Sequence, residues 1–203
     1  PVDPATLYAS LDRYPYGCTE QTVSRAMPLL YSEQLVAMGA RGSRDNARDR
    51  VQTAVNTILN RQGAEGAFGL WREGDGNASP WLGAYSTDFI YRAKAAGYAV
   101  PDEALDRAYG ALRAVSTGDQ WRIYGYDTDV YEGQYSNDTT EQMMYRASAY
   151  ALYVLAKAGE ADISRLRYLH DRDLPKIDSP LARAQIGAGL AYMGDRSRAT
   201  SAF

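Results

Sequence analysis

The sequence contains one cysteine and one histidine among its 203 residues. A lone cysteine cannot form an internal disulfide, and so few thiol and imidazole groups leave no cluster with the ligand spacing of a metal site. No apolar run approaches the roughly 20 residues that a membrane-spanning helix needs, and no signal peptide is recognisable. We therefore expect neither a disulfide framework nor a membrane span, and we expect no metal and no other cofactor.

An excess of positive charge is also missing. The 22 lysines and arginines are outnumbered by 25 aspartates and glutamates, which gives a formal net charge of −3 without a basic patch. Nucleic acid is therefore not an expected partner. Phenylalanine is scarce at 3 residues, whereas tyrosine is abundant at 17. Because tyrosine has an apolar ring and a polar tip, so many of them predict a concave or interfacial surface that is partly wet.

No stretch alternates for long enough to predict a β-sheet, and the pattern is helical throughout. In chain order, helices are expected over residues 4–12, over residues 18–38, from Asp45, from Trp81 or Ser86 to Ala96, from Pro101 at the first helical position, from Thr139 or Thr140 to Gly159, and over residues 162–172 and 179–193. Pro28 predicts a kink or break inside the second helix. Residues 61–80 and 116–138 are predicted to be long loops.

Glycine marks the ends of four predicted helices, at Gly39, Gly97, Gly159 and Gly194. Glycine is the usual residue where a helix ends in a left-handed conformation. Each of these glycines is followed within a few residues by another predicted helix start, which is typical of a diverged helical-hairpin repeat. The sequence therefore predicts an all-α fold, a single domain over residues 1–203 built from antiparallel helix pairs.

The lone cysteine lies in the run Tyr14-Pro-Tyr-Gly-Cys18-Thr-Glu-Gln21, at the start of a predicted helix. Residues i and i+3 share one face of a helix, so the thiol of Cys18 and the side-chain amide of Gln21 can meet. Loss of ammonia from this pair would leave an internal thioester that an amine can attack, and a helix N-terminus would stabilise the departing thiolate. A buried, unreactive cysteine beside an ordinary glutamine explains the same spacing, since short motifs often arise by chance.

The residues around this pair carry more information. The run from Tyr14 to Pro28 resembles the thioester region of the alpha-2-macroglobulin family, and its bacterial branch most of all. The resemblance continues through Asn60-Arg-Gln62, Gly66-Ala-Phe-Gly-Leu-Trp71, Trp81-Leu-Gly-Ala-Tyr85-Ser-Thr-Asp88 and Ala95-Ala-Gly97, and more weakly through residues 148–156 and 178–184. It covers nearly the whole chain, and the cysteine motif is its most specific part.

The resemblance implies an α/α toroid, in which about six helical hairpins form an inner and an outer ring. This chain holds about four hairpins' worth of helices, so we expect an incomplete toroid, truncated at the C-terminal end. An incomplete toroid would expose an apolar edge near residues 179–203, with a risk of association or looseness there.

For the site, the resemblance implies a thioester in which Cys18 supplies the departing thiolate and Gln21 the acyl group. Glu20 belongs to the same signature, but its role there has no physical account. An acidic side chain in a first helical turn is also favoured by the helix dipole alone.

The resemblance further implies that aromatic rings keep water from the thioester. Tyr14 and Tyr16 flank the cysteine, Trp71 lies in the following loop, and Trp81 is the rival candidate for the same role. Ordinary core packing explains these rings as well, because most buried aromatic side chains are simply part of a core.

The function that the resemblance implies is a protease trap. Cleavage of a bait region elsewhere in the parent would bare the thioester, and a lysine of the attacking protease would then displace Cys18 from Gln21. Because such a domain reacts once, we expect an inhibitor rather than an enzyme. The expected partners are target proteases, bound covalently through lysines, and the other domains of the parent macroglobulin. The resemblance also implies a periplasmic parent, held at the inner membrane by a lipid, with a role in bacterial defence.

Two enzyme classes compete with this interpretation. α/α toroids also host glycosidases, terpene cyclases and prenyltransferases, and Asp127, Asp129 and the acids of residues 132–141 could form a carboxylate pair, although solvation of a polar loop explains them. A cysteine hydrolase would need a histidine near Cys18. The single histidine, His170, lies far away in sequence and well past the loop where complement relatives carry an acyl-transfer histidine. This departure favours direct attack by amines, and we expect a surface or capping role for His170.

Overall fold

The computed structural model describes residues 17–32, 47–119, 121–124 and 137–203. The predicted helix over residues 4–12, the helix end at Gly39 and the start at Asp45 lie outside the described residues. Within the described part, regular structure is helical apart from one isolated β-bridge between Gln62 and Phe68. The predicted absence of a sheet is therefore confirmed for these residues.

The described residues form nine α-helices and three short helical turns. The α-helices are α2 (Thr19–Ala26), α4 (Ala47–Leu59), α5 (Pro80–Ala95), α6 (Asp102–Thr117), α7 (Trp121–Tyr124), α9 (Asn137–Ala158), α10 (Ile163–Tyr168), α11 (Pro180–Tyr192) and α12 (Arg196–Ser201). Three short segments of other helical types join them: the 3-10 turns η1 (Met27–Tyr31) and η3 (Leu174–Lys176) and the π-helical turn η2 (Leu169–Asp173).

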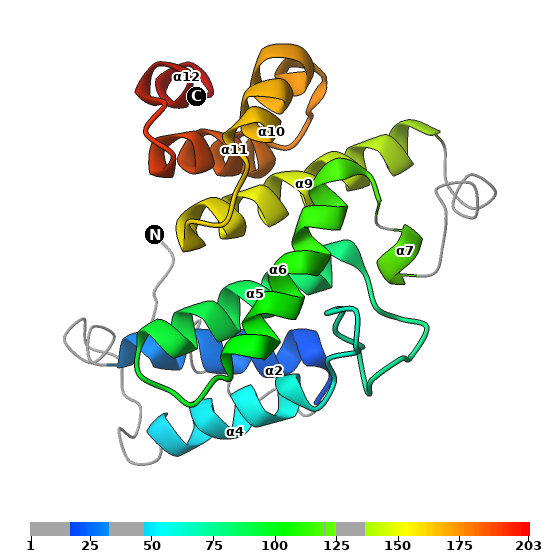
Figure 1. Ribbon diagram of the computed structural model, residues 1–203, viewed down its shortest axis with the longest axis vertical. Coiled ribbons are helices and arrows are strands. Elements are labelled where there is room, and N and C mark those ends of the chain that lie inside the picture. Colours follow the sequence, from blue (N-terminus) through cyan, green and yellow to red (C-terminus); the bar gives the residue numbers. More distant parts are fainter. Residues whose placement is uncertain (1–16, 33–46, 120, 125–136) are drawn as a thin grey trace, which may run out of the picture.

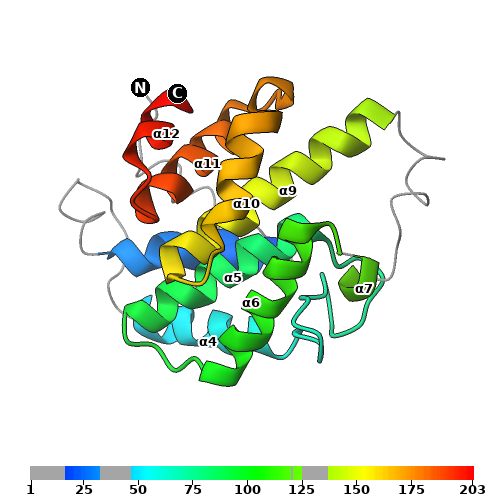
Figure 2. The ribbon, with the colours of Figure 1, turned by 45° about the horizontal axis from the view of Figure 1, so that its top comes forward.

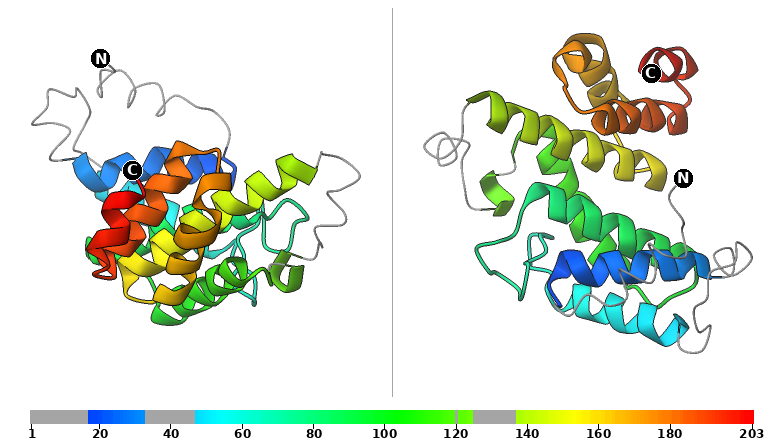
Figure 3. Two further views of the ribbon diagram at one scale, coloured as in Figure 1. Left: turned by 90° about the horizontal axis from the view of Figure 1, so that it is seen from above. Right: turned by 180° about the vertical axis from the view of Figure 1, so that it is seen from behind.

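Four of these helices lie side by side across the molecule, in the order α2, α5, α9 and α11 (Figure 1). Each of them also contacts the next α-helix of a second row: α4 packs on α2, α6 on α5, α10 on α9 and α12 on α11. Figure 2 shows the two rows from a second direction. The first hairpin and the last one lie at opposite ends, as the view from behind in Figure 3 also shows. This is the predicted array of helical hairpins.

Three of the four predicted helix ends are confirmed, at Gly97, Gly159 and Gly194. Their φ angles are +82°, +80° and +83°, in the region that glycine adopts without strain. In each case the N–H of the following residue donates to a carbonyl of the last helical turn, at 2.8–3.0 Å. Pro28 also acts as predicted, because α2 stops at Ala26 and the chain continues as the 3-10 turn η1.

Several predicted boundaries are wrong. Pro101 is the N-cap of α6 rather than its first helical residue. The loop predicted over residues 116–138 is shorter, since α6 continues to Thr117 and α7 forms a single turn inside it. The next helix, α9, begins at Asn137 rather than at Thr139 or Thr140. One helical turn carries too little periodic pattern to be recognised, which explains why α7 was missed.

The helix predicted over residues 162–172 is also wrong in its extent. It consists of α10, the π-helical turn η2 and the 3-10 turn η3. Pro175 lies in η3, where it has no N–H to continue an α-helix. At the next helix, Ser179 accepts a hydrogen bond from the N–H of Ala182 at 3.2 Å, and Pro180 occupies the first turn.

Two apolar clusters form the core, and they meet at α9. The larger cluster unites α2, α4, α5, α6 and one side of α9, where Val154 and Leu155 are buried. The smaller one joins the other side of α9, with Leu152, to α10, α11 and α12. Beyond the second cluster, Leu181 and Phe203 are 67% and 84% exposed. Apolar side chains are thus exposed in the expected region, residues 179–203. No helix in the described part of the chain has the length and apolar character to cross a membrane.

Candidate functional site

Cys18 occupies the N-cap position of α2 and is buried, with 5% of its surface exposed. Its side chain lies toward the backbone N–H of Gln21, and the Oε1 atom of Gln21 accepts a hydrogen bond from the N–H of Cys18 at 3.4 Å. The two side chains thus fold toward each other's backbone, in the reciprocal arrangement of a capping box. The structure therefore places the two residues of the predicted thioester in reciprocal contact, each side chain against the backbone of the other residue.

Thr19 fixes this helix start to the loop that follows α4. Its N–H donates to the carbonyl of Leu70 at 2.8 Å, and its hydroxyl donates to the carbonyl of Gly69 at 2.6 Å. Thr19 is fully buried, so both bonds are shielded from water. We call residues 17–21, with their contacts on Gly69 and Leu70, the Cys18 turn.

The guanidinium of Arg61 also joins the Cys18 turn to this loop. Nη2 donates to the carbonyl of Gly17 at 2.8 Å, and Nη1 donates to the hydroxyl of Thr19 at 3.1 Å and to the carbonyl of Leu70 at 3.4 Å. The arginine therefore bonds to the residue before Cys18 and to the residue after it. Burial lowers the pKa of Arg61, and negative charge at Cys18 and Asp75 acts in the opposite direction.

The loop that carries Gly69 and Leu70 is itself anchored on α6. Gln62 donates from Nε2 to the carbonyl of Ala104 at 2.8 Å, and Phe68 is fully buried in the larger core cluster. At Gly69 the carbonyl of Arg72 comes so close that a Cβ atom would lie 1.8 Å from it, so only glycine fits. The loop thus has a defined shape against which the Cys18 turn packs.

Asp75 closes this loop. Its carboxylate accepts hydrogen bonds from the backbone N–H groups of Leu70, Trp71, Arg72 and Asn77, at 2.5–3.1 Å. Burial opposes the charged form, but the four donors outweigh it and lower the pKa of Asp75 to about 2. The charge of Asp75 therefore holds the segment that presents the Leu70 carbonyl to Thr19.

The other predicted site residues have distinct locations. Glu20 is exposed on α2, and its charge contributes to the raised pKa of Tyr85, of which burial is the larger cause. Trp71 directly follows Leu70 but is 53% exposed. Trp81 is 43% exposed in the first turn of α5, where its ring packs on Tyr85 with centroids 5.1 Å apart. Shielding of a thioester by either tryptophan therefore stays a prediction. Tyr14 and Tyr16 lie outside the described residues.

A groove with a volume of about 520 Å³ runs between α5, α9 and α11. Aromatic side chains form much of its wall: Trp81, Tyr85, Tyr150 and Tyr153. This is the kind of partly wet concave surface that the high tyrosine content predicts. Asp127 and Asp129, candidates for a glycosidase-like carboxylate pair, are outside the described residues.

Asp88 lies at the base of this groove and is buried. It forms an ion pair with Lys157 of α9, accepts from Nε of Arg92 at 2.9 Å, and accepts from the hydroxyl of Tyr150 at 3.4 Å. We call these four residues the Asp88 cluster. Burial lowers the pKa of Lys157 although Asp88 opposes this effect. For Arg92, burial also acts against the charged form, but the bonds to Asp88 and Tyr31 raise its pKa overall.

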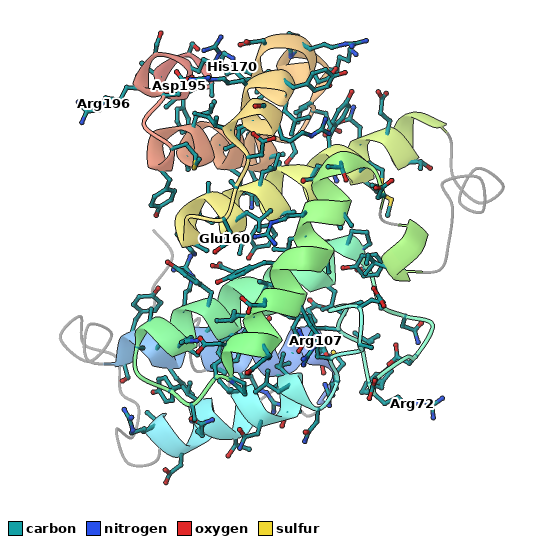
Figure 4. All side chains as sticks on the ribbon, viewed as in Figure 1. Arg72, Arg107, Glu160, His170, Asp195 and Arg196 are labelled. Carbon is teal, nitrogen blue, oxygen red and sulfur yellow. The ribbon has the colours of Figure 1, made fainter. Side chains whose placement is uncertain are left out.

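His170 lies far from the Cys18 turn, in η2 at the opposite end of the molecule (Figure 4). Its ring nitrogens are 2.8 Å from a carboxylate oxygen of Asp171 and 2.9 Å from the hydroxyl of Ser201. These contacts attach η2 to α12, and the His170 side chain is 13% exposed, so it is partly buried between the two segments rather than free on the surface. No group of three or more histidine, cysteine, aspartate or glutamate side chains in the described ranges is arranged to hold a metal ion.

Sequence reasoning missed Arg61, Thr19 and Asp75 as parts of the site. Arg61 belongs to the run Asn60-Arg-Gln62, in which the resemblance to the family was already evident. That run was the available signal for Arg61, but nothing in the sequence connects it with a residue 42 positions earlier.

Comparison with known proteins gives consistent matches. A family model described as the A-macroglobulin TED domain matches residues 3–114. An alpha-2-macroglobulin from Escherichia coli K12 is 33% identical over 205 residues, which cover 100% of this chain and 12% of that protein. The chain thus spans only a small part of the curated relatives that it matches.

Solved structures match over the whole chain as well. Native alpha-2-macroglobulin from E. coli, from domain MG7 to the C-terminus, has a TM-score of 0.82 at 32% identity, and the match covers 100% of this chain and 30% of that one. Salmonella alpha-2-macroglobulin reacted with methylamine has a TM-score of 0.82 at 36% identity, over 100% of this chain and 12% of that one. The predicted α/α toroid class is confirmed by this likeness.

Proposed function

This chain belongs to the A-macroglobulin family as a TED, or thioester-containing, domain, and from that premise we propose that Cys18 and Gln21 form an internal thioester that captures amines. The observation that carries the proposal is the reciprocal contact of these two residues at the N-terminus of α2. Alpha-2-macroglobulins are protease inhibitors rather than catalysts, so a reaction that occurs once per molecule suits the family.

Formation of the thioester needs only the two side chains. The sulfur of Cys18 attacks the amide carbon Cδ of Gln21, a C–S bond forms, and the C–N bond of the amide breaks. The nitrogen leaves as ammonia after taking up the thiol proton. The position at a helix N-terminus favours the thiolate as the attacking group, because the unpaired N–H groups of the first turn attract negative charge.

Capture of an amine reverses the role of the sulfur. The nitrogen of the amine bonds to Cδ of Gln21, the C–S bond breaks, and its electron pair stays on the sulfur. One proton passes from the attacking nitrogen to the thiolate or to water. The products are an amide at Gln21 and a free thiol at Cys18, so the domain does not turn over.

The surroundings of Cys18 favour survival of the bond until it is used. Cys18 is buried, and the segment of Gly69 and Leu70 is hydrogen-bonded directly to the next residue, Thr19. Exclusion of water protects a reactive acyl group from hydrolysis. We therefore propose that this loop, with Trp71 beside Leu70, forms part of the cover over the thioester.

For the parent protein we propose a protease trap in which lysines of the bound protease are the attacking amines. A bait region and the conformational change that bares the thioester would belong to other domains of the parent, because this chain matches only 12% of the length of its E. coli relative. On the resemblance to the bacterial branch, we also propose a periplasmic location with a lipid anchor. Fractionation of cells that express the full-length parent would test this location.

Treatment with methylamine tests the thioester. The chain is purified without denaturant or high pH, and its mass is measured before and after mild treatment with the amine. We expect a mass lower by one ammonia before treatment, then addition of methylamine at Gln21 and one new thiol at Cys18.

Two variants serve as controls. Cys18→Ala and Gln21→Met should both lack the mass deficit and incorporate no methylamine. Absence of incorporation into the unmodified sequence would contradict the thioester. Continued turnover of a sugar or isoprenoid substrate by Cys18→Ala would instead support the competing enzyme class.

A further inference from the structure

The three hydrogen-bond acceptors of Arg61 belong to the two neighbours of Cys18 in the chain and to the loop that packs on them. Gly17 precedes the cysteine, Thr19 follows it, and Leu70 is the loop residue whose carbonyl also binds the N–H of Thr19. All three acceptors are neutral oxygen atoms. No ion pair in the described part of the chain includes Arg61, so no carboxylate among these residues directly compensates its positive charge.

Cys18 is buried between the two residues of its turn to which this guanidinium donates, Gly17 and Thr19. Negative charge at Cys18 would favour the charged form of Arg61. The carboxylate of Asp75 binds four backbone N–H groups of its own loop. Glu20, the other acid near the turn, is exposed to solvent on α2. Arg61 is therefore a cation placed to respond to a charge that develops on the sulfur.

We propose that Arg61 is a positioning residue for the thioester reaction, which holds the Cys18 turn in its reacting shape and balances the negative charge of the Cys18 thiolate. The inference rests on the proposed function for the capture step. When the amine has bonded to Cδ of Gln21 and the C–S bond breaks, the electron pair remains on the sulfur. A fixed positive charge next to that sulfur stabilises the leaving group, and it needs no rearrangement at that moment.

The same charge acts in the opposite direction during formation of the thioester. There the thiolate of Cys18 is the attacking group, and the positive charge of Arg61 stabilises that anion. The two roles share one physical cause, so a single substitution should weaken both. An experiment can distinguish these two roles from a purely structural role of Arg61, because stabilisation of the thiolate charge depends on pH and on salt concentration.

The first experiment measures Cys18 without a thioester. In the Gln21→Met background the thiol is permanently free, and its alkylation by iodoacetamide is followed from neutral to high pH. We expect Arg61→Gln to slow alkylation at neutral pH by about fivefold. The rates should converge at high pH, where every thiol is ionised. Arg61→Lys should retain most of the original rate, and added salt should narrow the difference between the variants.

Arg107→Gln is the matched control. Arg107 also reaches this loop, through a bond from its Nη2 to Oε1 of Gln62 at 3.1 Å, but it lies on α6 (Figure 4). Its substitution should leave the alkylation profile unchanged. If Arg61→Gln lowers the alkylation rate by the same factor at every pH, the substitution has altered access to the thiol. That result would overturn the charge role of Arg61. If Arg61→Gln gives the same pH profile of alkylation as the Gln21→Met protein that keeps Arg61, the inference is overturned altogether.

The second experiment measures capture in the natural Cys18 and Gln21 background. Arg61→Gln should slow methylamine addition by a similar factor, and Arg61→Lys should restore most of it. Unchanged addition would contradict the role in the capture step. If no variant incorporates methylamine, including the unsubstituted chain, the proposed thioester function fails, while the alkylation profile still decides whether Arg61 stabilises the thiolate. Circular dichroism confirms that each variant is folded.

Discussion

The Cys18 turn and the Asp88 cluster lie on neighbouring helices, but they differ in how their charged side chains are compensated. In the Asp88 cluster, one buried carboxylate binds Lys157 and Arg92, so negative and positive charges are paired. In the Cys18 turn, the hydrogen bonds of Arg61 to described residues all go to neutral oxygen atoms. The first arrangement joins α5 to α9, and the second surrounds the cysteine of the proposed thioester.

This difference suits two roles: the Asp88 cluster acts as a structural scaffold, and the Cys18 turn is the proposed reactive site. A buried charge is tolerated when a partner compensates it, and removal of one partner is then strongly destabilising. A cation without a carboxylate contributes less to stability, but it can stabilise negative charge that appears during a reaction. We therefore expect substitutions in the Asp88 cluster to change stability and substitutions of Arg61 to change reactivity.

The largest expected effect belongs to Asp88→Ala. Without the carboxylate, Lys157 and Arg92 would remain close together without a counter-charge. We expect the free energy of unfolding to fall by about 3–5 kcal/mol, measured by urea denaturation. The alkylation rate of Cys18 in the Gln21→Met background should stay within about twofold under conditions where the variant is folded.

Asp102→Asn is the control for this prediction. Asp102 forms an ion pair with Lys94, but its side chain is 84% exposed. Exposed pairs contribute little, so we expect a change below about 0.5 kcal/mol. Equal costs for the two substitutions would show that the Asp88 cluster is not a structural centre.

Much of this fold could be predicted from local patterns. The ends at Gly97, Gly159 and Gly194 follow from a conformation that glycine adopts most easily, and the break at Pro28 follows from its missing N–H. The single turn of α7 and the π-helical turn η2 could not be predicted, because both depend on packing by distant residues rather than on a local repeat.

The site divides in the same way. The contact between Cys18 and Gln21 follows from their spacing of three positions at the start of α2, whereas the thioester between them stays a proposal. The role of Arg61 depends on a contact with Thr19 across 42 positions, and the pair of Asp88 and Lys157 spans 69 positions. Such pairs are formed by the tertiary fold, and a single sequence contains no periodic signal for them.

An intermediate effect is expected for Asp75→Asn. The folded-state pKa of Asp75, about 2, is below its ordinary value of 3.8. Its stabilising contribution is therefore fully present above pH 4 and is lost as the pH falls toward 2. Because solvent reaches the carboxylate, we expect a contribution of about 1 kcal/mol. The variant should show faster hydrogen exchange at the N–H groups of Leu70 and Arg72 at pH 5, and faster alkylation of Cys18 in the Gln21→Met background.

Glu73→Gln removes one charge from the same loop and provides the matched control. Glu73 is exposed, so its substitution should alter neither hydrogen exchange nor alkylation. Acidification from pH 5 to 2 should open the loop in the unsubstituted protein but have little further effect in Asp75→Asn. Loop opening that begins well above pH 4 would mean that another group controls it.

The smallest expected effect concerns the bond that joins the two regions. The hydroxyls of Ser24 on α2 and Tyr85 on α5 are 3.0 Å apart. Tyr85→Phe removes this bond and keeps the ring against Trp81. Because the bond is only partly buried, we expect the free energy of unfolding to fall by about 0.5 kcal/mol, the low end for a hydrogen bond. The alkylation of Cys18 in the Gln21→Met background should not change, because Arg61, Gly69 and Leu70 hold the Cys18 turn independently of Tyr85.

Tyr145→Phe provides the comparison for this last substitution. The hydroxyl of Tyr145 donates to Glu141 one turn away on α9, at an exposed position, so its loss should cost less than that of Tyr85. A several-fold rise in alkylation after Tyr85→Phe would show that the aromatic groove is coupled to the Cys18 turn. The division into a scaffold and a reactive site would then be wrong, since movement at α5 would reach the sulfur through α2.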